Sequence, residues 1–264
     1  MDLNLGGKTA LITGASRGIG FAVAKRFITE GCAVRIAARP TERLAKAEAE
    51  LKRIPGAELR SYGLDLSLAD AREQLVGACE DIDILVNCAG VIPRATIEEM
   101  DDAAWRESWE LKLFGTIDLT RAYYARMKAK RSGVIVNVIG SAGERPDFNF
   151  AAGSVANAAL IALTRALGGV SPDFGFRVVG VNPGSVGTER TIEQIKRNAV
   201  RRFNDESRWK EIDEEMNKTR PFGKIQTADQ MAAVIVFLAS DHAQYVTGTV
   251  VTADGGANSR TRTH

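Results

Sequence analysis

Residues 13–20, Thr-Gly-Ala-Ser-Arg-Gly-Ile-Gly, have the composition of a loop that binds phosphate groups. Glycine lets the backbone turn sharply and approach a pyrophosphate without a clash from a Cβ atom. The segment follows an apolar run and precedes a helical pattern, so the first N–H groups of that helix are free to bind an anion. This context favours a dinucleotide site over an ordinary turn between a strand and a helix. The residues expected to contact the dinucleotide are Gly14, Ser16, Arg17, Gly18, Ile19 and Gly20.

The end of the next apolar run indicates which dinucleotide is preferred. An acidic residue at this place binds the ribose 2′-hydroxyl of NAD, whereas an arginine accommodates the 2′-phosphate of NADP. The run ends in Ala37-Ala38-Arg39, without an acid. Arg17 supplies a second guanidinium near the same phosphate, so we expect NADP(H) to be preferred over NAD(H). The alternative is that Arg39 begins the next helix and faces solvent.

The elements that position these loops alternate along the chain between strands and helices. Apolar strands separated by helices indicate a parallel sheet that is covered on both faces. The sequence shows no repeat, low-complexity tract or linker, so we expect one doubly wound α/β domain over residues 1–264. The predicted strands are 8–13, 33–38, 82–87, 133–139, 177–181 and 249–253, and the predicted helices are 21–30, 42–52, 105–130, 156–168 and 229–240.

Composition excludes several classes of function. Hydrophobic residues make up 45% and charged residues 26% of the chain, as in soluble globular proteins. A net charge of +2 gives no reason to expect nucleic acid or a membrane surface as a partner. The N-terminus lacks a signal-peptide pattern, and apolar runs such as residues 231–239 are short for a membrane span. Three cysteines and two histidines without ligand spacing predict no metal site and inert thiols in a reducing cytoplasm.

From about residue 5 to residue 257 the chain resembles the short-chain dehydrogenase/reductase family. Besides the glycine motif, the resemblance rests on Asp65-Leu66, Asn87-Cys88-Ala89-Gly90, Asn182-Pro183-Gly184 with Thr188, residues 245–248 and residues 254–256. It implies a Rossmann-type fold, a nicotinamide cofactor, a small-molecule substrate and a homotetramer or homodimer. The further cofactor contacts that it implies are Asp65, Leu66, Asn87, Ala89, Gly90, Pro183, Gly184, Val186 and Thr188.

The family's catalytic set of Ser, Tyr, Lys and Asn is matched only in part. Ser141, which follows a predicted strand, corresponds to the Ser, although a turn serine would also suit that place. The helical register of residues 158–165 puts Gly153 in the place of the Tyr and Asn157 in that of the Lys. Lys112 stands where the family has Asn. A Lys normally stabilises the phenolate of the Tyr, whose pKa is otherwise near 10.

We therefore hypothesise that Lys112 and Asn157 have exchanged places and that Lys112 restores the positive charge from the opposite wall of the site. A partly desolvated lysine has a lowered pKa and is able to act as the acid. The alternative is a solvated helix residue. The candidate catalytic residues are thus Ser141, Lys112 and Asn157. Losing a positioned acid costs roughly 10²–10⁴ in rate, so the missing Tyr does not exclude catalysis.

Residues 189–220 correspond to the family's substrate lid. Their charges are nearly balanced, which favours a solvated helical lid. An acidic substrate is the alternative, because an arginine-rich first half precedes an acidic second half. Arg145, shortly after Ser141, is a further candidate for orienting a carboxylate or carbonyl.

Three functions follow in order of preference. The first is an NADP(H)-dependent oxidoreductase of carbonyls or alcohols with a non-standard proton donor. The second is an inactive NADP(H)-binding sensor or partner subunit. The third is a non-redox lyase or isomerase on the same fold.

Overall fold

A computed structural model describes residues 2–260; Met1 and residues 261–264, which include His264, lie outside the described residues. Seven strands form one parallel sheet in the order β3-β2-β1-β4-β5-β6-β7. This confirms the predicted doubly wound sheet, with the order reversing between β1 and β4. The strands are β1 (Thr9–Thr13), β2 (Ala33–Ala38), β3 (Glu58–Gly63), β4 (Ile84–Asn87), β5 (Val134–Val138), β6 (Arg177–Pro183) and β7 (Val250–Ala253).

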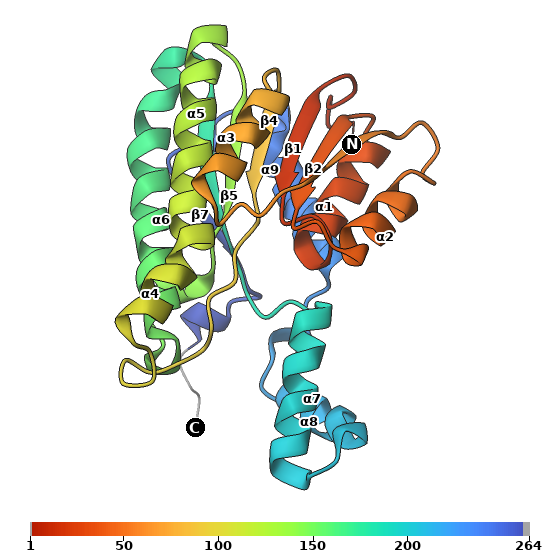
Figure 1. Ribbon diagram of the computed structural model, residues 1–264, viewed down its shortest axis with the longest axis vertical. Helices are drawn as coiled ribbons and strands as arrows, with labels where there is room; N and C mark the ends of the chain where they lie inside the picture. The colour runs from red at the N-terminus through yellow and green to blue at the C-terminus, as the bar shows by residue number, and fades with distance from the viewer. Residues whose placement is uncertain (1, 261–264) are drawn as a thin grey trace.

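Helices cover both faces of the sheet (Figure 1). One face carries α1 (Gly18–Thr29), α2 (Glu42–Leu51) and α9 (Ala228–Ala239), and α1 packs extensively on α9. The other carries α3 (Ala69–Ala78), α5 (Gly115–Lys130) and α6 (Ala151–Val170). Strand β1 explains why both faces are apolar: Ala10 and Ile12 enter one core cluster, and Leu11 enters the other.

The helix predicted over residues 105–130 contains an irregular turn. It begins earlier, as α4 (Asp102–Trp109), and then passes through a π-helical turn, η1 (Glu110–Phe114), into α5. Lys112 lies in the middle of this π turn. Such turns widen a helix by one residue and occur often at functional sites.

Helix α6 starts at Ala151, five residues before its predicted start, so Gly153 and Asn157 both lie on it. Among the described residues, the helical stretch Phe148–Phe174 is long and apolar enough to cross a membrane by length and composition, which the sequence analysis did not anticipate. Its central part is α6, whose buried side packs on β6. A buried core helix has the same composition.

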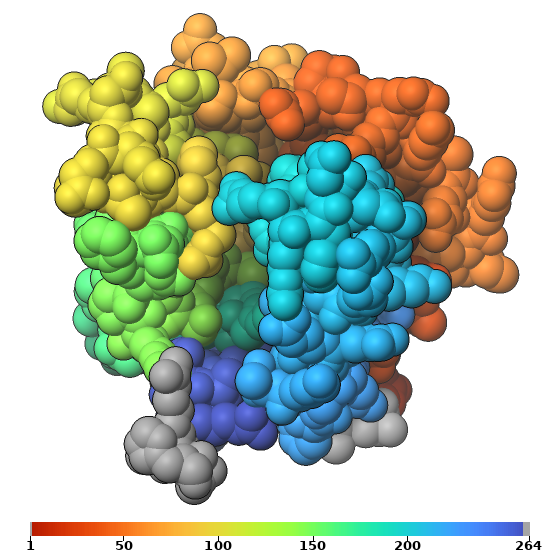
Figure 2. All heavy atoms as spheres, turned by 90° about the horizontal axis from the view of Figure 1, so that it is seen from below, coloured from red at the N-terminus to blue at the C-terminus, as the bar shows by residue number. Residues whose placement is uncertain are grey.

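A helical pair projects from the carboxyl edge of the sheet (Figure 1). It consists of α7 (Glu189–Phe203) and α8 (Trp209–Asn217), joined through the 3-10 turn η5 (Glu206–Arg208). Ile195, Ala199 and Ile212 form a small core of their own between the two helices. Seen from below, this pair lies across a hollow from α4 and the start of α6 (Figure 2). The remaining 3-10 turns are η2 (Ser141–Gly143), η3 (Phe148–Phe150), η4 (Ser171–Phe174), η6 (Pro221–Gly223), η7 (Asp241–Ala243) and η8 (Ala257–Ser259).

Candidate functional site

The glycine loop is packed too closely for side chains. Gly14 has φ +69°, and a Cβ there would lie 2.8 Å from the Cα of Ala89. A Cβ at Gly20 would lie 2.5 Å from the carbonyl oxygen of Gly14. The Thr13 hydroxyl accepts hydrogen bonds from the N–H groups of Cys88 (3.0 Å) and Ala89 (3.1 Å). The carboxyl ends of β1 and β4 are therefore joined directly, with bare backbone at their junction.

The N-terminus of α1 is free of a side-chain cap. Arg17 holds the N-cap position, and its side chain accepts no hydrogen bond from the first turn. The unpaired N–H groups and the positive end of the helix dipole fit the phosphates of a dinucleotide. A Cβ at Gly18 would lie 3.2 Å from Cγ2 of Thr188. The glycine loop and the loop after β6 thus meet where the sequence predicts the cofactor.

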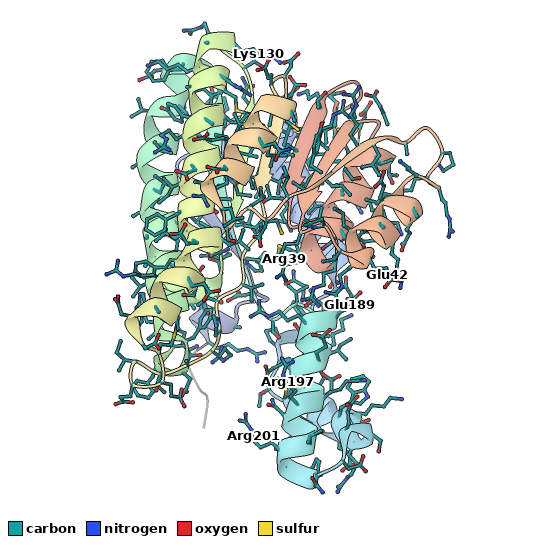
Figure 3. All side chains as sticks on the ribbon, in the orientation of Figure 1. Arg39, Glu42, Lys130, Glu189, Arg197 and Arg201 are labelled. Carbon is teal, nitrogen blue, oxygen red and sulfur yellow. The ribbon has the colours of Figure 1, made fainter. Side chains whose placement is uncertain are left out.

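Of the two arginines expected to contact the 2′-phosphate of NADP, Arg39 and Arg17, only Arg17 lies differently from the prediction. Arg39 is exposed and has no salt bridge within the part of the chain that the structure describes. Arg17 instead faces the helical pair, with Nη1 3.4 Å from Oε1 of Glu193. Arg43, which the sequence analysis missed, lies 4.0 Å from Glu189, as Arg17 does. Figure 3 shows Arg39 and Glu189 on the same side of the molecule, at the carboxyl edge of the sheet.

Two of the predicted cofactor residues after β3 and β4 have clear structural contacts. Asp65 accepts hydrogen bonds from the backbone N–H (3.1 Å) and hydroxyl (2.7 Å) of Ser67, which fixes the turn after β3. Leu66, next to it, is buried. Asn87 is buried and donates from Nδ2 to Asn137 (2.9 Å) and to Thr120 (3.1 Å). These contacts hold the loop ends in place.

The loop after β6 is built in the same close-packed manner. A Cβ at Gly184, which follows Pro183, would lie 2.8 Å from the Cα of Asp254. The carbonyl of Val186 accepts a hydrogen bond from the hydroxyl of Thr191 (2.7 Å). Thr188 caps α7 by accepting a hydrogen bond from the N–H of Thr191. Each predicted residue of this loop therefore lies at the carboxyl edge, beside the start of the helical pair.

Lys112 is held firmly at the end of β5. Its Nζ donates hydrogen bonds to the carbonyls of Val138 (2.7 Å) and Ile139 (3.0 Å). Its alkyl chain lies on Gly90, where a Cβ would come 2.2 Å from Cδ of the lysine. The pKa of Lys112 is lowered to about 8, mainly by burial; Cys88 opposes this shift and the positive charge of Arg190 adds to it. Lys112 is therefore not a solvated surface lysine.

Asn157 approaches the same segment from the other side. It is buried on α6, and its Nδ2 lies 2.8 Å from the point where a Cβ at Gly140 would stand. Ser141 follows Gly140 directly and is half-buried at the start of η2. Lys112 and Asn157 thus approach the carboxyl end of β5 from two different helical segments, and Ser141 follows this strand end in the chain.

The position of Gly153 is filled by another side chain. A Cβ at Gly153 would lie 2.0 Å from Cζ of Phe150, so the phenyl ring covers the glycine. The guanidinium of Arg94 lies over this ring, 5.5 Å from its centre, and pairs with Asp147. Phe150 is not among the site residues that the sequence predicts. Its packing on Gly153 depends on α6 beginning at Ala151, whereas the sequence pattern predicted a helix start at residue 156.

Two arginines near the predicted site, Arg145 and Arg190, each donate a hydrogen bond to a backbone carbonyl. Arg145 is exposed and donates to the carbonyl of Ala257 (3.4 Å), so it ties its loop to the C-terminal segment. Arg190 was not singled out, yet its Nη2 donates to the carbonyl of Ile92 (3.2 Å). The sequence could have pointed to Arg190 through its place two residues after Thr188, at the start of the segment expected to form the lid.

Burial also raises the pKa of the Cys88 thiol to about 11, so this thiol stays protonated.

Comparison with known proteins identifies the family. The sequence model described as short chain dehydrogenase matches residues 8–199. The chain belongs to this family. It is 32% identical over 262 residues to the uncharacterized oxidoreductase YvrD of Bacillus subtilis (strain 168), covering 97% of this chain and 98% of that protein. It is 30% identical over 254 residues to acetoacetyl-CoA reductase of Allochromatium vinosum, covering 94% and 98%.

Solved structures of short-chain dehydrogenases give the same result. L-Sorbose reductase from Gluconobacter frateurii, complexed with NADPH and L-sorbose, superposes with a TM-score of 0.92 at 29% identity, covering 99% of this chain and 100% of the other. YwfH, an NADPH-dependent reductase involved in bacilysin biosynthesis, has a TM-score of 0.86 at 25% identity, covering 95% and 98%. The resemblance seen in the glycine motif and the later segments is thereby confirmed as family membership.

Proposed function

We propose that this short-chain dehydrogenase is an NADP(H)-dependent oxidoreductase that interconverts a carbonyl and an alcohol, with Lys112 as proton donor. The observation that carries the proposal is the Lys112 ammonium, which donates to the carbonyls of Val138 and Ile139, shortly before Ser141 in the chain, and has a lowered pKa. The bound nicotinamide would supply the hydride in the direction of reduction. Similarity to L-sorbose reductase in its NADPH complex supports the choice of reaction and cofactor.

The chain's own residues would bind that cofactor by backbone and charge. The glycine loop and the uncapped start of α1 suit the pyrophosphate. Arg39 has no counter-charge among the described residues and suits the 2′-phosphate. Arg17 contributes less to that phosphate in our proposal, because Glu193 already pairs with it.

The proton would come from Lys112. An ammonium has three N–H donors, and two of those on Lys112 are used by Val138 and Ile139. The third remains for the substrate oxygen, which takes up a proton as the hydride reaches the carbonyl carbon. The Ser141 hydroxyl would donate a hydrogen bond to the same oxygen and polarise the carbonyl. Solvent then returns a proton to the neutral amine.

Two roles complete the proposal. Asn157, packed on Gly140, would hold the backbone next to Ser141 in place rather than transfer a proton. The pair α7 and α8 would act as the lid and exclude water from the reacting atoms when it closes.

The test compares Lys112→Met and Lys112→Arg with the unaltered protein. NADPH oxidation is measured with a panel of ketones and aldehydes, and NADPH binding is measured separately by thermal shift. We expect both variants to bind NADPH and to lose roughly 10²–10⁴ in turnover, because neither arginine nor methionine delivers a proton at neutral pH. Unchanged turnover in Lys112→Met would contradict the proposal.

The inactive alternative is favoured by one observation, the filling of the Gly153 position by Phe150. It predicts a thermal shift with NADPH and no oxidation of NADPH by any carbonyl tested. The lyase or isomerase alternative predicts conversion of substrate with no net consumption of NADPH.

A further inference from the structure

The basic residues of the lid fall into two groups. Four of them pair with carboxylates within the helical pair or its turns: Lys196 with Glu206 (2.8 Å), Arg202 with Glu215 (2.6 Å), Arg208 with Glu211 (2.7 Å) and Arg220 with Asp213 (2.6 Å). Among the described residues, Lys210 in α8 and Lys218 just after it have no such partner, and the same holds for Arg190, Arg197 and Arg201 on α7. Within the described residues, none of the three has a carboxylate in salt-bridge distance. The charges of the lid are thus balanced on one side of α7 only.

The three unpaired arginines form one row. They are separated by seven and four residues on α7, and this spacing places them on a single helix face. The opposite face carries Ile195 and Ala199, which pack against α8. The row spans about 16 Å at 1.5 Å per residue. Figure 3 shows Arg197 and Arg201 pointing from α7 to the side away from α8.

The upper end of this arginine row reaches the candidate active site. Arg190 is half-buried and donates to the carbonyl of Ile92, in the loop that follows β4. Besides burial, the charge of Arg190 lowers the pKa of Lys112. Besides burial, the charges of Arg17 and Arg197 lower the pKa of Arg190. Arg190 therefore joins the row to the segment that holds Lys112, and Arg197 and Arg201 continue the row along α7.

Nearby carboxylates neutralise the row only in part. Glu189 and Glu193, at the start of α7, lie within salt-bridge distance of Arg17 or Arg43, and the charge of Glu193 also raises the pKa of Arg190. An arginine row that is only partly neutralised repels itself, and the half-buried Arg190 adds a cost of desolvation. A solvated helix face explains the exposure of Arg197 and Arg201, but it does not explain why Arg190 turns inward onto Ile92. An anion between the lid and the body accounts for all three.

We propose that the arginine row binds an anionic group of the substrate, a carboxylate or a phosphate, so that the enzyme acts on acidic carbonyl compounds. The proposal rests on the oxidoreductase function proposed above. Guanidinium groups bind both anions through paired, charge-assisted hydrogen bonds. The carbonyl would lie at Lys112 and Ser141, and the anionic end would lie along Arg190, Arg197 and Arg201.

The experiment measures binding to the NADPH-saturated protein, so that phosphate sites of the cofactor are occupied. Two matched pairs of probes are used: 2-oxoglutarate with its dimethyl ester, and fructose 6-phosphate with fructose. We expect at least one acidic probe to bind about tenfold or more tightly than its neutral partner, and less tightly as salt is raised. The carboxylate and phosphate arms show which anion is preferred.

Two double variants make the test specific. Arg197→Ala with Arg201→Ala removes two charges from the row, and Lys196→Ala with Arg202→Ala removes two paired charges from the same helix. We expect the first to abolish the preference for the acidic probe and the second to retain it. Equal losses in both, or no preference for either acid in the unaltered protein, would overturn the proposal.

NADPH oxidation with the same probes is recorded separately. Binding of an acidic probe, without oxidation of NADPH by that probe or by any ketone or aldehyde of the panel, would leave the anion site standing and contradict the oxidoreductase proposal. Oxidation of NADPH with neutral ketones only, without tighter binding of the acidic probes, would support the oxidoreductase proposal and overturn the anion site.

Discussion

At the scale of single residues, a lysine in the π turn between α4 and α5 reaches the carboxyl end of β5. Its ammonium is fixed by two carbonyls, and burial lowers its pKa to about 8. On α6, the corresponding space is taken by a buried asparagine and by a phenyl ring over a glycine. A charged amine and a buried amide thus lie near one strand end, and they come from two different helical segments.

The pH dependence of turnover follows from Lys112. Reduction needs the protonated amine, so the rate is expected to fall as pH rises above about 8, and oxidation needs the neutral amine and should rise toward that value. The unfolded chain binds this proton more tightly, so Lys112 also adds to the free energy of unfolding as pH rises from about 8 toward 10.5. Rate profiles in both directions check this; profiles that are flat from pH 7 to 9.5 would speak against Lys112.

The contact between Phe150 and Gly153 predicts that the effect of Gly153→Ala on the free energy of unfolding changes sign when the ring of Phe150 is removed. Gly153→Ala is expected to destabilise the protein, because displacing the ring costs roughly 1–3 kcal/mol and the gain in helix propensity is only about 1 kcal/mol. In a Phe150→Ala background the same substitution should stabilise, since no ring is displaced. Urea unfolding of the unaltered protein, the two single variants and the double variant gives the coupling energy between positions 150 and 153. The same sign in both backgrounds would show that the ring does not constrain position 153.

At the scale of elements, sequence patterns located what is buried and missed what is exposed or irregular. Strands β1, β2, β4 and β5 were found because their side chains are apolar on both faces of the sheet. The edge strand β3 and the weakly amphipathic α3 were missed, since Glu58–Gly63 is largely polar. The π turn has no signature in composition. Glycine loops could be predicted from local chemistry, whereas the turning of Arg17 toward Glu193 depends on where the lid lies.

The junction of β2 and α2 predicts the cofactor preference. Arg39→Ala is expected to weaken NADPH binding by about 10- to 100-fold, the worth of one or two charge-assisted hydrogen bonds, and to leave NADH binding nearly unchanged. Arg17→Ala should have a smaller effect, because its guanidinium is shared with Glu193. Titration calorimetry with both nucleotides measures this. Equal losses for NADPH and NADH would show that Arg39 does not read the 2′-phosphate.

At the scale of the whole molecule, a continuous sheet carries a small helical appendage with its own core. The site lies where the two meet, so its geometry depends on how the lid sits. Large apolar side chains remain exposed elsewhere, including Tyr245, with 99% of its surface accessible, and Val155 and Val170 on α6. Contiguous exposed apolar surface marks contact sites, so these residues are the ones to test for contacts between copies of the chain.

The family resemblance and these exposed side chains predict a homotetramer or homodimer. Light scattering during size-exclusion chromatography is expected to give two or four chain masses, and Tyr245→Glu is expected to lower the value if the C-terminal strand lies in the contact. Arg106→Glu, at another exposed place, serves as control. A monomer at micromolar concentration would contradict the prediction.

The burial that lowers the pKa of Lys112 also makes this side chain a site for selective chemical labelling. A neutral amine is a nucleophile, and at pH 8 about half of the Lys112 side chains are neutral, whereas lysines near the ordinary value of 10.5 are almost entirely charged. Aldehyde reagents followed by borohydride should therefore label this one lysine first. A bound nucleotide would shield it, so the pattern of labelling alone would report occupancy of the pocket before any substrate is known.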